Sequence, residues 1–355
     1  MFKMKVSRKL FGNISGQQIY QYILSNDNGM ELKVINYGGI VTHLLVPDKE
    51  GNIKDVVLGF DHLDGYLGDH PFFGAIIGRY GNRIAHGQFS INDKIYRLPI
   101  NNGGHCLHGG VETFSHKIWD IEPIEHHEYC GLKLSLTSPD GDQGFPGNLN
   151  VEVHYLLDDS NTWRIKYRAI TDQATVVNMT QHAYFNLKGH DGGPVLKHSL
   201  RLNADHFTPV DETMIPTGEI ASVENTPFDF RYPQEVGLMM DGGLDPMIEG
   251  ARGYDLNYVL NGVDGELRPI AEVVNNVSGI VMEVCTTEPG AQLYIGNWLD
   301  GIKGKGGVAY HAYHGLCIET QHFPDAPNHP HFPSTFLLPD EVLESETSYS
   351  FSVHK

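Results

Sequence analysis

Apolar and polar side chains alternate with a period of two at several places along the chain. Residues 162–170, TWRIKYRAI, put Trp163, Ile165, Tyr167 and Ala169 on one face and basic side chains on the other. Such alternation predicts a β-strand with one buried face, because successive side chains of a strand point to opposite sides. The same pattern recurs in residues 132–138, 151–157, 280–286 and 348–355.

Turn-forming residues separate these candidate strands at short intervals. The chain holds 40 glycines and 19 prolines, and no helical periodicity extends over ten or more residues. Residues 89–98, FSINDKIYRL, predict a hairpin in which Asn92 and Asp93 form the turn. The sequence therefore predicts an all-β fold, a sandwich or a barrel. We expect a single domain over residues 1–355, since no linker or repeat divides the chain, and we expect residues 242–253 to form an exposed loop.

The charge balance limits the classes of partner. Lys and Arg total 25 against 44 Asp and Glu, a formal net charge of −19. Nucleic acids and anionic membranes select cationic surfaces, so we expect neither as a partner. No signal peptide and no apolar run of about 18 residues are apparent, which predicts a protein that does not span a membrane.

The cysteines and histidines were considered as metal ligands. No CxxC pair occurs among the four cysteines, which are Cys106, Cys130, Cys285 and Cys317. The sequence therefore predicts neither a disulfide framework nor a structural zinc site. A reducing cytoplasm is the expected setting of the protein. Twenty histidines are present, and the pair His329 and His331 would chelate a metal if it lay on a strand. No HExxH spacing occurs, so we predict no metal site.

Two glycine-rich segments place polar side chains close to the backbone. In residues 76–87, Arg79 and Arg83 flank Gly81 and Asn82, so that a guanidinium group and an amide can face one cleft. The alternative is that both arginines are solvated or paired with acids. In residues 101–110, glycines surround His108 and allow a ligand to approach the imidazole. The alternative there is an ordinary surface turn.

Two further segments place ionisable groups among apolar residues. His182 lies among Thr180, Tyr184 and Phe185, where burial or a partner can tune its charge, although core histidines with satisfied hydrogen bonds are common. Glu319 ends the apolar run of residues 316–318, where a salt bridge at a sheet end is the alternative to a functional role.

Smaller signals favour a sugar site. Asp255 stands between two tyrosines, and Gln292 and Trp298 lie beside glycines. Aromatic rings stack on the C–H faces of sugars, while Asn, Asp, Arg and Gln bind hydroxyl groups. No phosphate-binding loop and no dinucleotide-binding fingerprint occurs in the sequence.

Six motifs in order along the chain resemble those of the aldose 1-epimerase family, also called galactose mutarotases. They are GRYGNRI, LHGG, QHAYFNL, GYDLNY, PGAQLYIGN and ETQHFPDAPN, and they span most of the sequence. The resemblance implies a large antiparallel β-sandwich with an open sugar-binding cleft on one face. It also implies interconversion of the α and β anomers of free aldohexoses such as glucose and galactose.

The resemblance assigns roles to seven residues of this chain. It implies Glu319 as the base, His182 as the acid and His108 as a second active-site histidine. It implies that the sugar hydroxyls are contacted by Asn82, Arg83, Asp255 and Gln292.

Mutarotation requires one base and one acid acting on neighbouring oxygens. The C1 hydroxyl loses a proton while the ring oxygen gains one, the C1–O5 bond opens, and the ring recloses on the other face. We expect Glu319 to be ionised near neutral pH, and a nearby carboxylate to help keep His182 protonated. No redox step or nucleophile takes part, so we expect no cofactor, and the expected partner is a monosaccharide. The sequence leaves open whether the protein is a monomer or a homodimer.

Three other functions were weighed. A glycoside hydrolase would need two carboxylates flanking the scissile bond, and only Asp255 keeps that possibility open. A hexose-6-phosphate 1-epimerase would need a further cationic pocket. A non-catalytic carbohydrate-binding module would not need both Glu319 and His182.

Overall fold

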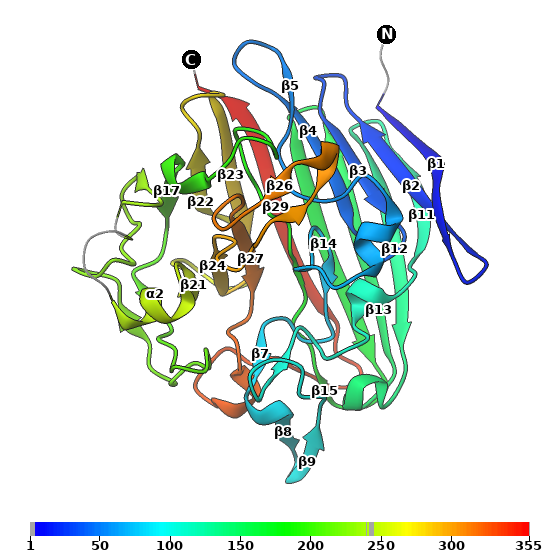
Figure 1. The fold of residues 1–355 in the computed structure, drawn as a ribbon. Coiled ribbons are helices and arrows are strands. Elements are labelled where there is room, and N and C mark those ends of the chain that lie inside the picture. The colour runs from blue at the N-terminus through cyan, green and yellow to red at the C-terminus, as the bar shows by residue number, and fades with distance from the viewer. Residues whose placement is uncertain (1–3, 239, 241–244, 355) are drawn as a thin grey trace.

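The structure, a computed structural model, describes residues 4–238, 240 and 245–354, and most of its regular elements are antiparallel strands. The largest sheet has nine strands and runs through the molecule from edge to edge (Figure 1). In spatial order they are β11 (Asp120–Glu125), β12 (Tyr129–Ser138), β13 (Leu149–Asp158), β14 (Thr162–Thr171), β29 (Leu343–Val353), β23 (Ile280–Thr286), β22 (Arg268–Val274), β17 (Ser199–Leu202) and β20 (Gln234–Glu235).

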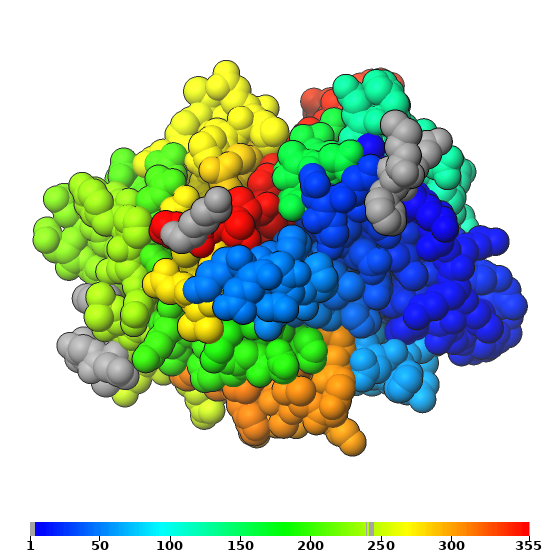
Figure 2. Space-filling model, turned by 90° about the horizontal axis from the view of Figure 1, so that it is seen from above, coloured from blue at the N-terminus to red at the C-terminus, as the bar shows by residue number. Residues whose placement is uncertain are grey.

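Two five-stranded sheets pack with the nine-stranded sheet. The first contains β1 (Lys5–Ile14), β2 (Gln17–Ser25), β3 (Glu31–Ile35), β4 (Val41–Pro47) and β5 (Ile53–Asp55). The second contains β19 (Ala221–Ser222), β18 (His206–Phe207), β21 (Asp255–Val259), β24 (Gly290–Tyr294) and β27 (Cys317–Gln321). In Figure 2 the blue N-terminal strands lie directly against green and red segments that are distant in the sequence.

The remaining elements are short. The two-residue and four-residue strands are β6 (Ile76–Ile77), β7 (Arg83–Ile84), β8 (Gln88–Ile91), β9 (Lys94–Arg97), β10 (Cys106–Leu107), β15 (Thr175–Val176), β16 (Thr180–Gln181), β25 (Ile302–Lys303), β26 (Ala309–Tyr310) and β28 (Phe336–Leu337). The α-helices are α1 (Leu63–Leu67) and α2 (Pro246–Ala251). The 3₁₀ turns are Ala85–Gly87, Phe114–His116, Asp142–Gly144, Val195–Lys197, Lys305–Gly307 and Ala326–Asn328.

The predicted all-β antiparallel sandwich is confirmed. In β14 the side chains of Trp163, Ile165 and Tyr167 are buried, and the basic residues between them are half-buried or exposed. The hairpin is also confirmed, because β8 pairs with β9 and Asn92 and Asp93 adopt the left-handed backbone of its turn, with φ of 49° and 62°.

The expectation for residues 242–253 was partly wrong. Residues 242–244 lie outside the described residues, but the segment that follows forms α2 rather than a loop. Asp245 caps this helix by accepting from the Met247 N–H at 2.9 Å, and Pro246 occupies its first position. The helix is too short to show a helical period in the sequence.

One continuous hydrophobic core joins the three sheets. It contains Leu32 and Leu44 of the first small sheet, Leu293 and Ile318 of the second, and Val284 of the large sheet, all at most 1% exposed. The two small sheets are also joined through backbone bridges from Val57 to Phe185 and from Phe185 to Leu316. Leu316 directly precedes β27. Its backbone N–H donates to the Phe185 carbonyl and its carbonyl accepts from the Phe185 N–H, so these two hydrogen bonds fix the start of that strand.

An ion pair between a half-buried histidine and a buried carboxylate holds the other end of β27. His322 follows the strand, and its Nδ1 lies 2.6 Å from Oε2 of Glu288. Burial alone would lower the pKa of His322, but the Glu288 carboxylate outweighs it and raises that pKa above its usual value. Burial alone would raise the pKa of Glu288, but His322 outweighs it and lowers that pKa. The pair therefore stabilises the fold most between the ordinary pKa values of the two groups.

His322→Gln is expected to destabilise the protein at pH 5.5 and much less at pH 9. Because the His322 ring is 29% exposed while Glu288 is buried, its removal is expected to cost about 1–3 kcal/mol in the free energy of unfolding. Because folding raises the pKa of His322, the stabilisation that it provides is complete at pH values below its pKa in the unfolded chain. This stabilisation disappears as the pH rises through its pKa in the folded protein. Urea denaturation at both pH values measures the difference. His126→Gln, in the exposed turn after β11, serves as the control and should change neither value. An equal loss at both pH values would contradict the ion-pair role.

Two further sequence expectations concern membranes and cysteines. Among the described residues, no helix is both long enough and apolar enough to cross a bilayer. All four cysteines carry free thiols, as the absence of paired motifs predicted.

Candidate active site

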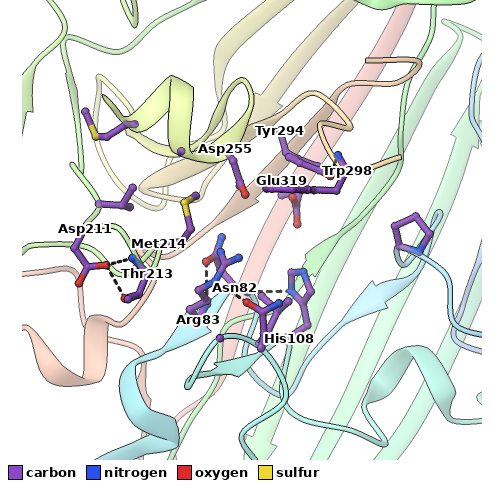
Figure 3. Close-up of a pocket in the computed structure, with 18 of the residues that line it drawn as sticks. Asn82, Arg83, His108, Asp211, Thr213, Met214, Asp255, Tyr294, Trp298 and Glu319 are labelled. Atoms are coloured by element: carbon purple, nitrogen blue, oxygen red, sulfur yellow. Dashed lines mark hydrogen bonds between the residues drawn. The ribbon is translucent and has the colours of Figure 1, made fainter. Parts of the chain in front are cut away.

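A cleft of about 790 Å³ lies over one face of the second small sheet. Its size is typical of sites for small molecules. In Figure 3 the carboxylates of Asp255 and Glu319 point into it from one side, and Asn82, Arg83 and His108 lie opposite them. The cleft thus collects residues that are far apart in the sequence.

Strand register builds the floor of this cleft. In β27 the side chains of Cys317, Glu319 and Gln321 share one face, while Ile318 and Thr320 point the other way, Ile318 into the hydrophobic core. Neighbouring strands continue the face, because Glu319 pairs with Gln292 of β24 and Gln292 pairs with Asn257 of β21. A row of polar groups therefore crosses three strands of a sheet whose other face is mostly apolar.

Asn82 and His108 hold each other in place on the opposite wall. The backbone N–H of Asn82 donates to Nδ1 of His108 at 3.1 Å, and the backbone N–H of His108 donates to the Asn82 carbonyl at 2.9 Å. The side-chain oxygen of Asn82 accepts from the Arg83 N–H at 2.9 Å. No described residue accepts from the side-chain NH2 group of Asn82, so these donors are available to a ligand.

Four residues that line the cleft have a left-handed backbone although none is glycine. They are Phe72, Asn82, His108 and Met214, with φ of 57°, 57°, 53° and 69°. This conformation is strained for bulky side chains and persists only where the surrounding structure enforces it. The clustering of such strain around one cleft is a feature of functional sites.

Aromatic rings surround the imidazole of His182. The Tyr184 ring lies 5.0 Å away with planes 16° apart, and the Phe72 ring lies 6.0 Å away with planes 25° apart. The His108 ring meets the His182 ring edge-on at 5.2 Å. These rings fix the plane of the imidazole and exclude water from it.

Glu319 and His182 form a close pair of ionisable groups on the cleft floor. Oε2 of Glu319 lies 3.7 Å from Nε2 of His182, and both side chains are about 95% or more buried. No described residue donates a hydrogen bond to Oε2 of Glu319. The two atoms therefore face the same small space, which a ligand would occupy.

Burial shifts the two pKa values in directions opposite to the sequence expectation. Desolvation, with a smaller contribution from the Asp255 carboxylate, raises the pKa of Glu319 well above its usual range, despite an opposing effect of Arg83. Desolvation lowers the pKa of His182 to about 3. The sequence predicted an ionised glutamate and a protonated histidine near neutral pH. Burial favours the uncharged form of each group instead, because neither charge is hydrated there.

Asp255 lies beside this pair and is supported by Gln292. Burial raises the pKa of Asp255, while Arg83 and the Gln292 amide act to lower it. Nε2 of Gln292 donates to Oδ1 of Asp255 at 2.7 Å, and Gln292 is 3% exposed and does not line the cleft. The structure therefore places Gln292 behind Asp255 rather than at the surface that a ligand touches.

His108, His182 and Glu319 also have the composition of a metal site, with ligand atoms within 4.8 Å of one another. The hydrogen bond at His108 argues against that use. Its Nδ1 accepts from Asn82, so the proton of the neutral ring resides on Nε2, and this nitrogen then has no lone pair for a metal. Burial lowers the pKa of His108 well below its usual value, so the ring stays neutral and donates through Nε2.

Two other candidates from the sequence lie away from the cleft. Arg79 is 2% exposed and donates to the backbone carbonyls of Ser138, Pro146 and Gly147, so it stabilises loops. His329 and His331 do not lie on a strand, because they follow the 3₁₀ turn Ala326–Asn328. Their ring nitrogens already have partners: Nε2 of His329 is 3.3 Å from Oδ2 of Asp325, and Nε2 of His331 is 2.7 Å from the Gly218 carbonyl oxygen. Chelation by this pair is therefore not supported.

Several cleft residues escaped the sequence analysis. Phe72 and Met214 come from irregular segments that carry no pattern. Tyr294 had a signal, because it is two residues from Gln292 on a strand and must share its face. Cys317 likewise shares the face of Glu319 on β27, but it is fully buried and does not line the cleft. Trp298, noted only as an aromatic beside glycines, is 53% exposed at the rim and packs against the Arg252 guanidinium at 4.5 Å.

Comparison with known proteins gives consistent results. The family profile described as aldose 1-epimerase matches residues 20–350. A galactose mutarotase of Bos taurus is 43% identical to this chain over 353 residues, and the match covers 99% of each chain. An aldose 1-epimerase of Escherichia coli is 36% identical, and the match covers 95% of this chain and 96% of that one. The crystal structure of a galactose 1-epimerase from Lactobacillus acidophilus superposes with a TM-score of 0.88 at 29% identity, covering 99% of this chain and all of that one.

Proposed function

Because this chain belongs to the aldose 1-epimerase family and interconverts the α and β anomers of aldoses, we propose that Glu319 and His182 carry out the proton transfers. The observation that carries the proposal is the separation of 3.7 Å between Oε2 of Glu319 and Nε2 of His182 on the cleft floor. The C1 hydroxyl oxygen and the ring oxygen of a pyranose are bonded to the same carbon. Two groups this close can each reach one of these oxygens.

The pair passes one proton back and forth during turnover. In ring opening, the Glu319 carboxylate takes the proton of the C1 hydroxyl while the protonated His182 gives one to the ring oxygen. After rotation about the C1–C2 bond, both transfers reverse and the ring recloses on the other face. The net charge of the pair is the same before ring opening and after both transfers are complete, so a buried site can support the coupled exchange without hydrating a new charge.

Substrate binding must favour the charged form of the pair. Sugar hydroxyls that donate to the Glu319 carboxylate stabilise its ionised form, and the Arg83 guanidinium acts in the same direction. The neighbouring faces of Tyr184 and Phe72 favour the imidazolium form of His182. We propose that the bound sugar thereby converts the uncharged pair into the reactive ion pair.

The other cleft residues hold the sugar. His108 acts as a neutral donor through Nε2, Asn82 donates through its amide, and Asp255 accepts from hydroxyl groups. We propose that Gln292 acts on the substrate only through Asp255. Positioned donors of this kind stabilise the negative charge that develops when the ring opens.

The charges of the cleft favour a neutral monosaccharide as the substrate. Among the described lining residues Arg83 is the single Lys or Arg, while four carboxylates face or border the space, from Asp211, Glu212, Asp255 and Glu319. A sugar phosphate would meet net repulsion there. We therefore propose free aldohexoses such as glucose and galactose as substrates of one domain spanning residues 1–355.

Polarimetry of freshly dissolved α-glucose and α-galactose tests this proposal. The purified protein should speed the decay of optical rotation far above the rate in protein-free buffer. Glucose 6-phosphate at the same concentration should react at least about tenfold more slowly, since one like-charge contact costs on the order of 1.4 kcal/mol or more. No acceleration of either free sugar would refute the activity, and equal rates on glucose and its phosphate would refute the preference for neutral sugars.

A further inference from the structure

We propose that Cys317 is a positioning residue that fixes the orientation and the tautomer of His182. Its Sγ lies 3.7 Å from Nδ1 of His182, on the edge of the ring away from Glu319. The inference rests on the proposed function of His182. The role assigned to the thiol is to accept the Nδ1–H of the imidazole, so that Nε2 is the nitrogen that exchanges its proton with the sugar.

The stacked rings leave one degree of freedom that Cys317 removes. Tyr184 and Phe72 are nearly parallel to the imidazole and set its plane. They do not decide which edge of the ring faces the sugar, because a half-turn about the Cβ–Cγ bond keeps the same plane. That choice depends on contacts within the plane, which are Cys317 at Nδ1 and Glu319 at Nε2.

A single strand supplies both of these contacts. Cys317 and Glu319 are two residues apart in β27, so their side chains point to the same face of the sheet. Cys317 is 0% exposed and pairs with Tyr294 on the next strand, so its Sγ has little freedom to move. The base and the group that orients the acid are thus held in a fixed relation by one segment of backbone.

The chemistry of a buried thiol suits this role. Burial, with smaller effects of Glu319 and Asp255, raises the pKa of Cys317 well above its usual value, so the sulfur remains an uncharged thiol. A second hydrogen bond at the far nitrogen fixes which tautomer a histidine adopts. A carboxylate in this place would stabilise the imidazolium strongly, whereas a thiol is only a weak acceptor. His182 therefore keeps a defined tautomer and still releases its proton easily.

Other groups around His182 also act on its charge. The His70 imidazole opposes protonation, while the ring's own backbone carbonyl favours it. The remaining titratable neighbours are His108, Tyr184, Tyr294, Cys317 and Glu319. Of these, Cys317 is the one for which a hydrogen-bond contact to Nδ1 is observed.

The test compares Cys317→Ala and Cys317→Ser with the wild type and with Cys130→Ala. Cys130 is a suitable control because it is also a buried thiol, with Sγ 3.7 Å from the Ser25 carbonyl, and it lies outside the cleft. Cys317→Ala should lower kcat about tenfold with little change in KM and should shift the pH profile of kcat. Cys317→Ser should retain most of the activity, and Cys130→Ala should behave as the wild type.

Nitrogen-15 NMR of the imidazoles gives a readout that is independent of activity. In the wild-type protein at neutral pH, His182 should be a single neutral tautomer protonated on Nδ1, and in Cys317→Ala it should become a mixture. A wild-type ring protonated only on Nε2 would overturn the proposal, as would unchanged kcat, pH profile and shifts in Cys317→Ala. Because the tautomer is read from the wild type, the proposal stays testable if the alanine variant does not fold. An inactive wild-type enzyme would instead overturn the function itself.

Discussion

Glu319→Gln is expected to abolish anomer interconversion while increasing the stability of the fold. The amide keeps the shape of the side chain but cannot take the proton of the C1 hydroxyl, and a positioned base contributes about 10²–10⁴-fold in rate. Stability should rise because burial makes the ionised form of Glu319 unfavourable in the folded protein. A carboxyl group whose pKa is raised by folding destabilises the folded state at pH values above its pKa in the unfolded chain. Glutamine carries no ionisable carboxyl group, so the variant avoids this cost.

Polarimetry and thermal denaturation at pH 7 measure the two effects together. Glu344→Gln is the matched control, because this carboxylate is exposed on β29 and its ion-pair partner among the described residues is Arg168, at 3.9 Å. It should change neither the rate nor the melting temperature. If Glu319→Gln kept most of the wild-type rate, another group would have to be the base.

His182→Asn is expected to lower kcat by about 10²–10⁴-fold, because the ring oxygen then loses the acid that protonates it during opening. The change in KM should be small, since in the proposed mechanism His182 acts on the reacting oxygen while Asn82, Arg83 and Asp255 contact the hydroxyl groups. Steady-state polarimetry over a range of galactose concentrations separates the two parameters.

His198→Asn provides the matched control for that variant. His198 is 1% exposed, and burial lowers its pKa to about 4, so it resembles His182 in environment. Its Nε2 accepts from the Leu187 N–H at 3.0 Å, outside the cleft. The control should lose stability but keep kcat at 25 °C. Equal loss of kcat in both variants would indicate that burial of a histidine, and not proton transfer, explains the effect.

The fold was predictable because its main signal is local. Alternation along β14 depends only on which face of a strand is buried, and the turn at Asn92 and Asp93 depends only on two residues that accept a left-handed backbone. Helix α2 was missed because six residues hold too few turns to show a period. The arrangement of three sheets around one core depends on contacts between distant strands, which one sequence does not reveal.

The residues of the cleft were predictable to different degrees. Glu319, His182 and His108 stood out by their motifs, and the structure brings them together. The ionisation of Glu319 and His182 was not predictable, because both pKa shifts come from desolvation by residues that only the folded chain assembles. Gln292 does not line the cleft and donates to Asp255, which its motif does not show, so its contact with the sugar stays a prediction.

The left-handed residues of the cleft limit how its sugar preference can be redesigned. Phe72, Asn82, His108 and Met214 hold a conformation that costs an ordinary residue about 1–2 kcal/mol, so a β-branched replacement would add strain as well as change the contact. Met247, in the first turn of α2, and Trp298, at the exposed rim, do not carry this constraint. Libraries that vary Met247 and Trp298 should therefore yield more folded variants with new sugar preferences than libraries that vary the left-handed positions.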